Sequence, residues 1–365
     1  MKKISVGGQA LIEGIMMKSP DKTAMAVRTP DKSIDIEYIE EKHIKDKLPF
    51  LGWPVLRGVV NFIESMILGY KTLMMSADKS GMTDLEEEEE RKRKAEKEAK
   101  KRAKLVAKGK IPADAPLTDT AENETADTTQ KEAENGNQKS TSPVVMAVMV
   151  VGAVLGVALA LFLFMWLPTA IFNGANTLLK GAIPNTARPL IEGVLKIAIF
   201  IGYVALTSLT KDIKRVFMYH GAEHKTIFCL ENELELSVEN VKKQSRFHPR
   251  CGTSFMILML VVGILVNLLI VTFFPNITKL AIVWVLIKLL MVPLICGIGY
   301  ELIKLCGKHN NLLTRIISAP GMWVQRLTTK EPEDDMIEVA IAAIKAVLPD
   351  DMKQIEVDGC CADIQ

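Results

Sequence analysis

The sequence predicts a mainly α-helical protein: a four-helix membrane bundle with a small cytoplasmic β-containing domain and amphipathic cytoplasmic helices. Four apolar runs carry the first part of this prediction, because each can cover a hydrocarbon core of about 30 Å, which takes about 20 residues. They are 144–167, 189–209, 253–274 and 279–302. Hydrophobic residues are 49% of the chain and charged residues 24%, but the charges are concentrated near 85–140. The average therefore hides a segregation typical of membrane proteins.

Composition divides the chain into six segments. These are an N-terminal cytoplasmic domain (1–80), a charged low-complexity linker (81–143), transmembrane helices 1 and 2 (144–209), a histidine-containing cytoplasmic loop (210–252), transmembrane helices 3 and 4 (253–305), and a cytoplasmic C-terminal segment with an amphipathic helix (306–365).

Short strands are expected at the N-terminus. The runs Thr23–Thr29 and Lys32–Ile39 flank the turn signal Pro30-Asp31 and predict a hairpin with one buried face. Gly7, Gly8 and Gly14 favour turns and a bulge over a close backbone approach.

Two amphipathic helices are predicted outside the spans. The first, 54–77, is too polar to cross a bilayer, so it lies on the membrane surface or packs on the strands. The second, 331–348, has one apolar stripe and acidic residues in its first turn, and it is expected to dock on the cytoplasmic domain.

The linker is read as solvated polar chain, because it cannot bury enough apolar area to offset its ordering entropy. Its basic run Arg91–Lys110 could contact anionic lipid or RNA, but no nucleic acid is expected as a partner.

Orientation follows from the positive-inside rule. The loop 210–252 is rich in basic residues, the loop 168–188 has only Lys180 and Arg188, and the turn 275–278 has none. We therefore predict a multi-pass protein of the bacterial cytoplasmic (plasma) membrane with both termini in the cytoplasm. The lipid bilayer is its expected partner, and its oligomeric state is left open.

The densest chemistry lies in Tyr219-His220-Gly221-Ala222-Glu223-His224-Lys225. Histidines four residues apart share one face of a helix and can reach one metal ion. The order His-x-x-Glu-His also matches the inverzincin pattern, in which the glutamate activates water. His220 and His224 are therefore candidate ligands of a divalent metal, zinc first, and Glu223 is the candidate catalytic base.

A catalytic zinc needs a third protein ligand, and three candidates remain: His248, Cys251 and Glu301. Three nitrogen or oxygen ligands with an open position suit hydrolysis, whereas adding Cys251 to them closes the tetrahedron and favours a structural site. The alternative is that these histidines contact lipid phosphates or pack between loops.

Polar residues inside the spans also need partners. Glu192 and Lys196 are four residues apart and can pair. Lys288 and Asn267 lie at similar depths in the last two spans, and we expect them to face each other inside the bundle.

Five separated motifs point to a family. They are VGGQALIEGIMMKSP, YHGAEHK, HPRCGTSF, GYE at 299–301 and PGMWVQRLTTKEPEDDMIEVAI. Together they resemble the YqhQ-like family of bacterial membrane proteins, over nearly the whole chain except about 80–143. Members carry the tag "predicted metal-dependent enzyme". The resemblance therefore implies a membrane architecture and a metal site at the histidines, but it supplies no substrate.

The leading hypothesis is a metal-dependent hydrolase whose site faces the cytoplasmic membrane surface. That position suits a lipid headgroup, a lipid-linked molecule or a membrane-protein segment as substrate. The alternative hypothesis is a non-enzymatic membrane scaffold or membrane-protein assembly factor.

Overall fold

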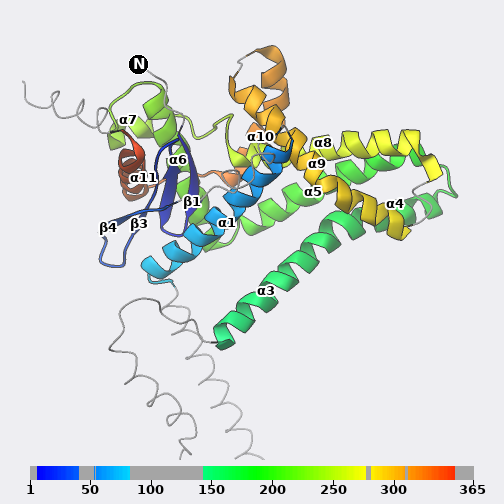
Figure 1. Cartoon of the computed structure of the whole chain (residues 1–365), viewed down its shortest axis with the longest axis horizontal. Helices are drawn as coiled ribbons and strands as arrows, with labels where there is room; N and C mark the ends of the chain where they lie inside the picture. The colour runs from blue at the N-terminus through cyan, green and yellow to red at the C-terminus, as the bar shows by residue number, and fades with distance from the viewer. Residues whose placement is uncertain are drawn as a thin grey trace, which may run out of the picture. The chain divides into compact units, whose positions relative to one another are not determined.

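The computed structural model describes residues 6–40, 53, 55–82, 143–276, 281–308 and 311–349 (Figure 1). The described chain is mainly helical and carries a small N-terminal antiparallel sheet. It divides into two compact units, one of Met1–Met82 with Phe162–Gln365 and one of Thr83–Leu161. Most of the predicted linker 81–143 lies outside the described residues, so the predictions made for it are not addressed.

The sheet is a meander of four antiparallel strands in the order β1-β2-β3-β4. The strands are β1 (Gly7–Leu11), β2 (Gly14–Lys18), β3 (Thr23–Arg28) and β4 (Ile34–Tyr38). The predicted hairpin is confirmed, because β3 pairs with β4 in the register that places Ala24 opposite Tyr38.

Helices cover both faces of this sheet. On one face, α6 (Lys211–Glu231) and α11 (Asp334–Val347) share a core with the strands. On the other face, α1 (Leu56–Lys79) packs Leu68 and Leu73 against a second core. Both amphipathic helices predicted from apolar spacing are present, and a single core joins the strands to residues of the 210–252 segment and to α11.

Four helices are long and apolar enough to cross a membrane. These candidate spans are Val154–Leu178, Arg188–Thr207, Gly252–Phe273 and Val283–Cys306. They belong to α3 (Pro143–Leu161) continued through a π-helical turn (Phe162–Trp166) into α4 (Leu167–Leu178), then to α5 (Arg188–Thr207), α8 (Gly252–Phe273) and α9 (Ala281–Lys308). The first span ends later than predicted, because the helix restarts at Leu167 and places Pro168 in its first turn, where proline is tolerated.

The helix α10 (Leu312–Thr328) was not predicted. It begins with a capping box between Asn311 and Thr314. It packs on α8, where a Cβ on Gly321 would lie 2.5 Å from the Cα of Ser254. Its outward side chains are exposed and apolar: Leu312, Leu313, Ile316 and Trp323.

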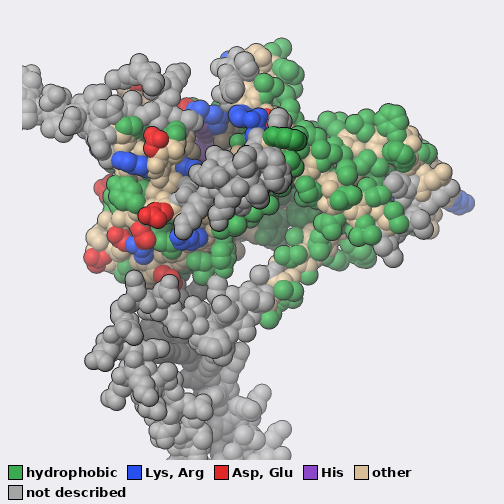
Figure 2. Space-filling model, in the orientation of Figure 1, with side chains coloured by type: hydrophobic (Ala, Val, Ile, Leu, Met, Phe, Trp, Pro, Cys, Tyr) green, Lys and Arg blue, Asp and Glu red, His purple; other side chains and the backbone are tan. Residues whose placement is uncertain are grey.

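Side-chain character is segregated over the surface. Hydrophobic side chains cover the part formed by α4, α5, α8 and α9, whereas acidic and basic side chains gather over the sheet and the helices beside it (Figure 2). An apolar belt around the long helices is what a bilayer requires.

The structure gives the polar residues of the spans other ion-pair and hydrogen-bond partners, and the facing of Lys288 and Asn267 stays a prediction. Glu192 pairs with Arg188 and with Lys288 instead of Lys196. Lys288 therefore takes its partner from α5, and the Asn267 amide donates to the Gly263 carbonyl one turn away. The pairing of Glu192 with Lys288 links residues 96 positions apart, which local spacing could not reveal.

Candidate metal centre

His220 and His224 project from the same face of α6, and their ring centroids lie 4.4 Å apart. The helix is continuous through Gly221, although glycine weakens helices. A Cβ on Gly221 would overlap the carbonyl oxygen of Lys330. The absence of that atom lets the segment after α10 cross α6, where the Lys330 N–H donates to the Phe217 carbonyl at 2.8 Å.

Both imidazoles are fixed by backbone carbonyls. Nδ1 of His220 lies 2.9 Å from the Thr328 carbonyl oxygen, and Nδ1 of His224 lies 2.5 Å from that of Arg246. Because a carbonyl only accepts, each Nδ1 must carry the proton. Each neutral ring therefore keeps its lone pair on Nε2, which is the arrangement that metal-binding histidines show.

Cys251 supplies the third ligand atom. It precedes α8, and its Sγ lies 3.2 Å from Nε2 of His220. The ligand atoms of His220, His224 and Cys251 all lie within 4.8 Å of one another, so this group could hold a metal ion. Tetrahedral zinc places such atoms about 3.3–3.6 Å apart, so small side-chain movements would close the set.

The surroundings of His224 favour its neutral form. His224 is 1% exposed, and its Nε2 has no hydrogen-bond partner among the described residues. Burial lowers the pKa of this imidazole, because the charged form is poorly solvated there. The lone pair of Nε2 is thus available near neutral pH.

Glu223 lies beside the two histidines and against the sheet. A Cβ on Gly8 of β1 would lie 2.9 Å from the Glu223 carboxyl carbon, so this glycine marks a close approach, contrary to the favoured prediction. Oε2 of Glu223 is buried without a partner among the described residues. Burial raises the pKa of Glu223, and the nearby rings of His220 and His248 oppose that shift.

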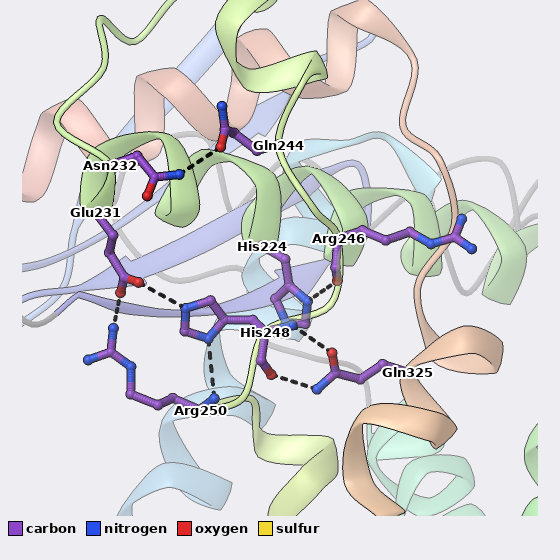
Figure 3. A network of polar contacts seen from close by, with 8 residues as sticks. All are labelled: His224, Glu231, Asn232, Gln244, Arg246, His248, Arg250 and Gln325. Carbon is purple, nitrogen blue, oxygen red and sulfur yellow. Dashed lines mark hydrogen bonds and ion pairs between the residues drawn. The ribbon is translucent and has the colours of Figure 1, made fainter. Parts of the chain in front are cut away.

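His248 lies next to the cluster but is occupied elsewhere (Figure 3). Its ring centroid is 5.8 Å from that of His224. Nε2 lies 3.4 Å from Oε2 of Glu231, and Nδ1 accepts the Arg250 N–H at 3.3 Å. Both ring nitrogens thus have partners, and burial lowers the pKa of His248 to about 4. His248 is not among the three groups that converge.

Glu301 is not brought to the cluster. Its carboxylate accepts two hydrogen bonds of 2.6 Å from the Arg57 guanidinium, which ties α1 to α9. Of the three candidates for a third ligand, the structure thus brings only Cys251 into contact with His220.

Gln325 is a residue of this region that sequence reasoning missed. It is fully buried, accepts the His248 N–H at 2.8 Å and donates to the His248 carbonyl at 2.7 Å (Figure 3). It therefore holds the turn that leads to Cys251. The motif PGMWVQRLTTKEPEDDMIEVAI contains Gln325 and Thr328, but nothing in its letters assigns them a role.

Two histidines and one thiol would fill three positions of a tetrahedral site, and the fourth has no assigned ligand among the described residues. Three protein ligands with an open position are typical of catalytic zinc sites, whereas structural sites are closed by four. The described chain thus combines four helices long and apolar enough to cross a membrane with a cluster that could hold a metal ion.

The chain belongs to the family described as "Protein of unknown function (DUF1385)", which matches residues 53–350. It is 32% identical to the "Uncharacterized protein YqhQ" of Bacillus subtilis (strain 168) over 350 residues, which cover 94% of this chain and 92% of the relative. No solved structure matches the chain.

Proposed function

We propose that this protein is a membrane-embedded, zinc-dependent hydrolase, with His220, His224 and Cys251 as ligands and Glu223 as general base. One observation supports it most strongly. Two imidazoles donate Nδ1–H to backbone carbonyls and leave their Nε2 atoms beside one thiol. A packing role for these histidines needs no such shared arrangement.

A bound zinc ion would act as a Lewis acid and make an attacking water more acidic. The protein itself orients the ligands and supplies the general base. Carbonyls of Thr328 and Arg246 hold the rings in one tautomer. The raised pKa of Glu223 brings its carboxyl closer to neutral pH, where a general base works best.

The site lies next to the spans in the chain. Cys251 immediately precedes α8, and α6 begins four residues after α5 ends. The basic residues of 210–252 support a position of this side in the bacterial cytoplasm, together with both termini, by the positive-inside rule. A substrate at the inner leaflet fits that position: a lipid headgroup, a lipid-linked molecule or a membrane-protein segment.

Metal analysis of the purified protein tests the proposal with a matched pair of thiols. Cys251 and Cys229 are both buried, but the Cys229 thiol donates to the carbonyls of Leu234 and Glu235 and is not part of the candidate ligand group. The expected result is about one zinc per chain in the wild type and in Cys229→Ser, and a large loss in Cys251→Ser. Equal zinc contents in Cys251→Ser and Cys229→Ser would contradict the ligand set, and stoichiometric copper in place of zinc would contradict hydrolysis.

A second candidate function is a scaffold or membrane-protein assembly factor. It is favoured by the exposed apolar side chains of α1, among them Met66, Ile67 and Tyr70. This function predicts stoichiometric partners in affinity purification and a cellular role that survives Glu223→Gln. The hydrolase predicts that Glu223→Gln abolishes that role with the metal content unchanged.

A further inference from the structure

A cluster of charged side chains lies inside the spans, away from the candidate metal centre. Arg188, Glu192 and Lys196 recur every four residues on α5, so they share one stripe of that helix. Lys288 of α9 donates to Oε2 of Glu192 at 2.5 Å. Arg188 Nε donates to Oε1 at 2.8 Å, and Thr169 of α4 donates to the same oxygen at 3.0 Å. Both carboxylate oxygens are therefore in use.

The paired members of the cluster are buried. Exposed fractions are 8% for Arg188, 2% for Glu192 and 5% for Lys288. Aromatic rings extend the stabilisation, because Lys288 Nζ lies 4.8 Å from the Trp284 ring centroid and the Arg188 guanidinium 5.3 Å from that of Phe172. Two cations thus share one carboxylate.

Lys196 adds a third cation without a carboxylate of its own. It is half-buried and lies close enough to Glu192 and Lys288 for electrostatic interaction with both. No hydrogen bond or ion pair joins it to the described part of the chain. Three cations against one carboxylate leave a positive excess within a span, where charge is costly unless it is neutralised.

Arg188 also has hydrogen-bond donors that the cluster does not use. Only Nε of Arg188 has a hydrogen-bond partner within the described residues, so its two terminal nitrogens remain available. Arg188 folds back along α5 to Glu192. Lys196 follows Glu192 by one helical turn on the same stripe, and helical side chains generally tilt toward the start of their helix. We therefore expect the two cations to flank Glu192, where a guanidinium and an ammonium can both contact one phosphate.

This cluster lies at the opposite end of α5 from the candidate metal centre. From Glu192 to the end of α5 at Thr207 the helix rises about 22 Å at 1.5 Å per residue, and α6 with its histidines follows. Arg188 begins the span, so lysine snorkelling brings the cationic group of Lys196 near that membrane surface. Phosphate groups of lipids are the anions present there.

We propose that Arg188 and Lys196 bind the phosphate of an acidic membrane lipid, and that the ion pair of Glu192 with Lys288 positions them. The shared chemistry is an anionic phosphate, which free phosphate could also supply. The lipid is favoured because Arg188 and Lys196 both lie within a candidate membrane span, where lipid rather than bulk water surrounds the helix.

Native mass spectrometry of the purified full-length protein tests this. Phosphatidylglycerol, zwitterionic phosphatidylcholine and inorganic phosphate serve as the probes. The wild type should retain phosphatidylglycerol in preference to phosphatidylcholine. Lys196→Gln should weaken retention of phosphatidylglycerol about tenfold, the expected loss of one charge-assisted contact, and Lys196→Arg should restore it. Lys180→Gln removes the same charge from an exposed loop position and should have no effect.

Three results would overturn the proposal. These are equal retention of the two lipids by the wild type, unchanged retention by Lys196→Gln, or displacement of phosphatidylglycerol by equimolar inorganic phosphate, which would mean a free-phosphate site. If Lys196→Gln fails to fold, the lipid comparison and the phosphate competition on the wild type still decide the question.

Discussion

Two backbone carbonyls determine how the histidines of α6 can act. Thr328 and Arg246 each accept from an Nδ1, which leaves Nε2 of both rings beside Cys251. His248 differs, because its ring nitrogens contact Glu231 and Arg250. At the residue scale, the identity of a ligand thus depends on what its second nitrogen contacts, and that information lies in distant segments of the chain.

The burial of His248 predicts that the folded protein loses stability in acid. Burial lowers its pKa from 6.5 to about 4. Between these values the unfolded chain binds a proton that the folded chain does not, so stability is complete above pH 6.5 and falls as the pH drops toward 4. The slope is about 1.4 kcal/mol per pH unit for one such group. The melting temperature of the metal-free wild type should fall as the pH is lowered from 6.5 to about 4. In the variant His248→Gln, the melting temperature should fall less steeply over the same range.

The buried His224 contributes to this acid sensitivity with the same sign, because its pKa is also lowered. The slope should therefore shrink in His248→Gln without vanishing. Identical pH profiles for the wild type and His248→Gln would show that His248 is not held neutral by burial.

The close approach of Gly8 to Glu223 predicts that a larger residue at position 8 destabilises the protein. A methyl group there meets the Glu223 carboxyl, whereas a methyl group on Gly7 meets nothing within 4 Å. Gly8→Ala should therefore destabilise the protein by about 1–3 kcal/mol, and Gly7→Ala should have little effect. Thermal melts of both variants, at equal zinc content, provide the measurement.

A double-mutant cycle tests the cause of that loss. In a Glu223→Ala background, Gly8→Ala should lose most of its cost, because the atoms that it meets are gone. An undiminished cost would place the conflict elsewhere and remove the argument that β1 positions the carboxylate.

At the scale of elements, sequence periodicity predicted what local spacing encodes. It predicted the β3–β4 hairpin, α1, α11 and the four long apolar helices. It missed α10, which contains Pro320 and Gly321 within a helix of mixed character. Glycine is a poor helix former, and at position 321 it allows the close approach of α8.

The same limit applies to the candidate site. The pair His220 and His224 follows from helical spacing, but the choice among His248, Cys251 and Glu301 does not. Glu301 binds Arg57, which lies 244 positions away in the sequence, and so is not part of the cluster. Gln325 hydrogen-bonds the backbone of His248 and thereby holds the turn that positions Cys251. Such tertiary partners leave no periodic signal in one sequence.

The close contact at Gly221, between α6 and the segment after α10, can be tested by substitution. A methyl group there overlaps the Lys330 carbonyl, so Gly221→Ala should push the segment after α10 away from α6. The Thr328 carbonyl would then leave His220, and zinc affinity should fall about 10–100-fold, as it does when ligand-orienting contacts are lost. Gly202→Ala, in open space on α5, is the matched control and should bind zinc normally. Competition with a zinc-binding dye measures both, and equal affinities would contradict the argument.

At the scale of the whole molecule, the apolar belt of Figure 2 and the basic loop 210–252 together set the expected orientation. Fusions to alkaline phosphatase, which is active only after export, report this orientation. Fusion after Ala182 should give high activity and fusion after Leu236 low activity, because positive loops stay in the cytoplasm. The reverse pattern would move the candidate metal centre to the outer surface and exclude the proposed inner-leaflet substrates.

We propose that one thiolate and two imidazoles hold a zinc ion beside the membrane. X-ray absorption at the zinc edge of the purified protein measures this directly. The expected first shell has one sulfur at about 2.3 Å and nitrogen or oxygen atoms at about 2.0–2.1 Å, with the sulfur lost in Cys251→Ser and kept in Cys229→Ser. A first shell without sulfur in the wild type would contradict the account.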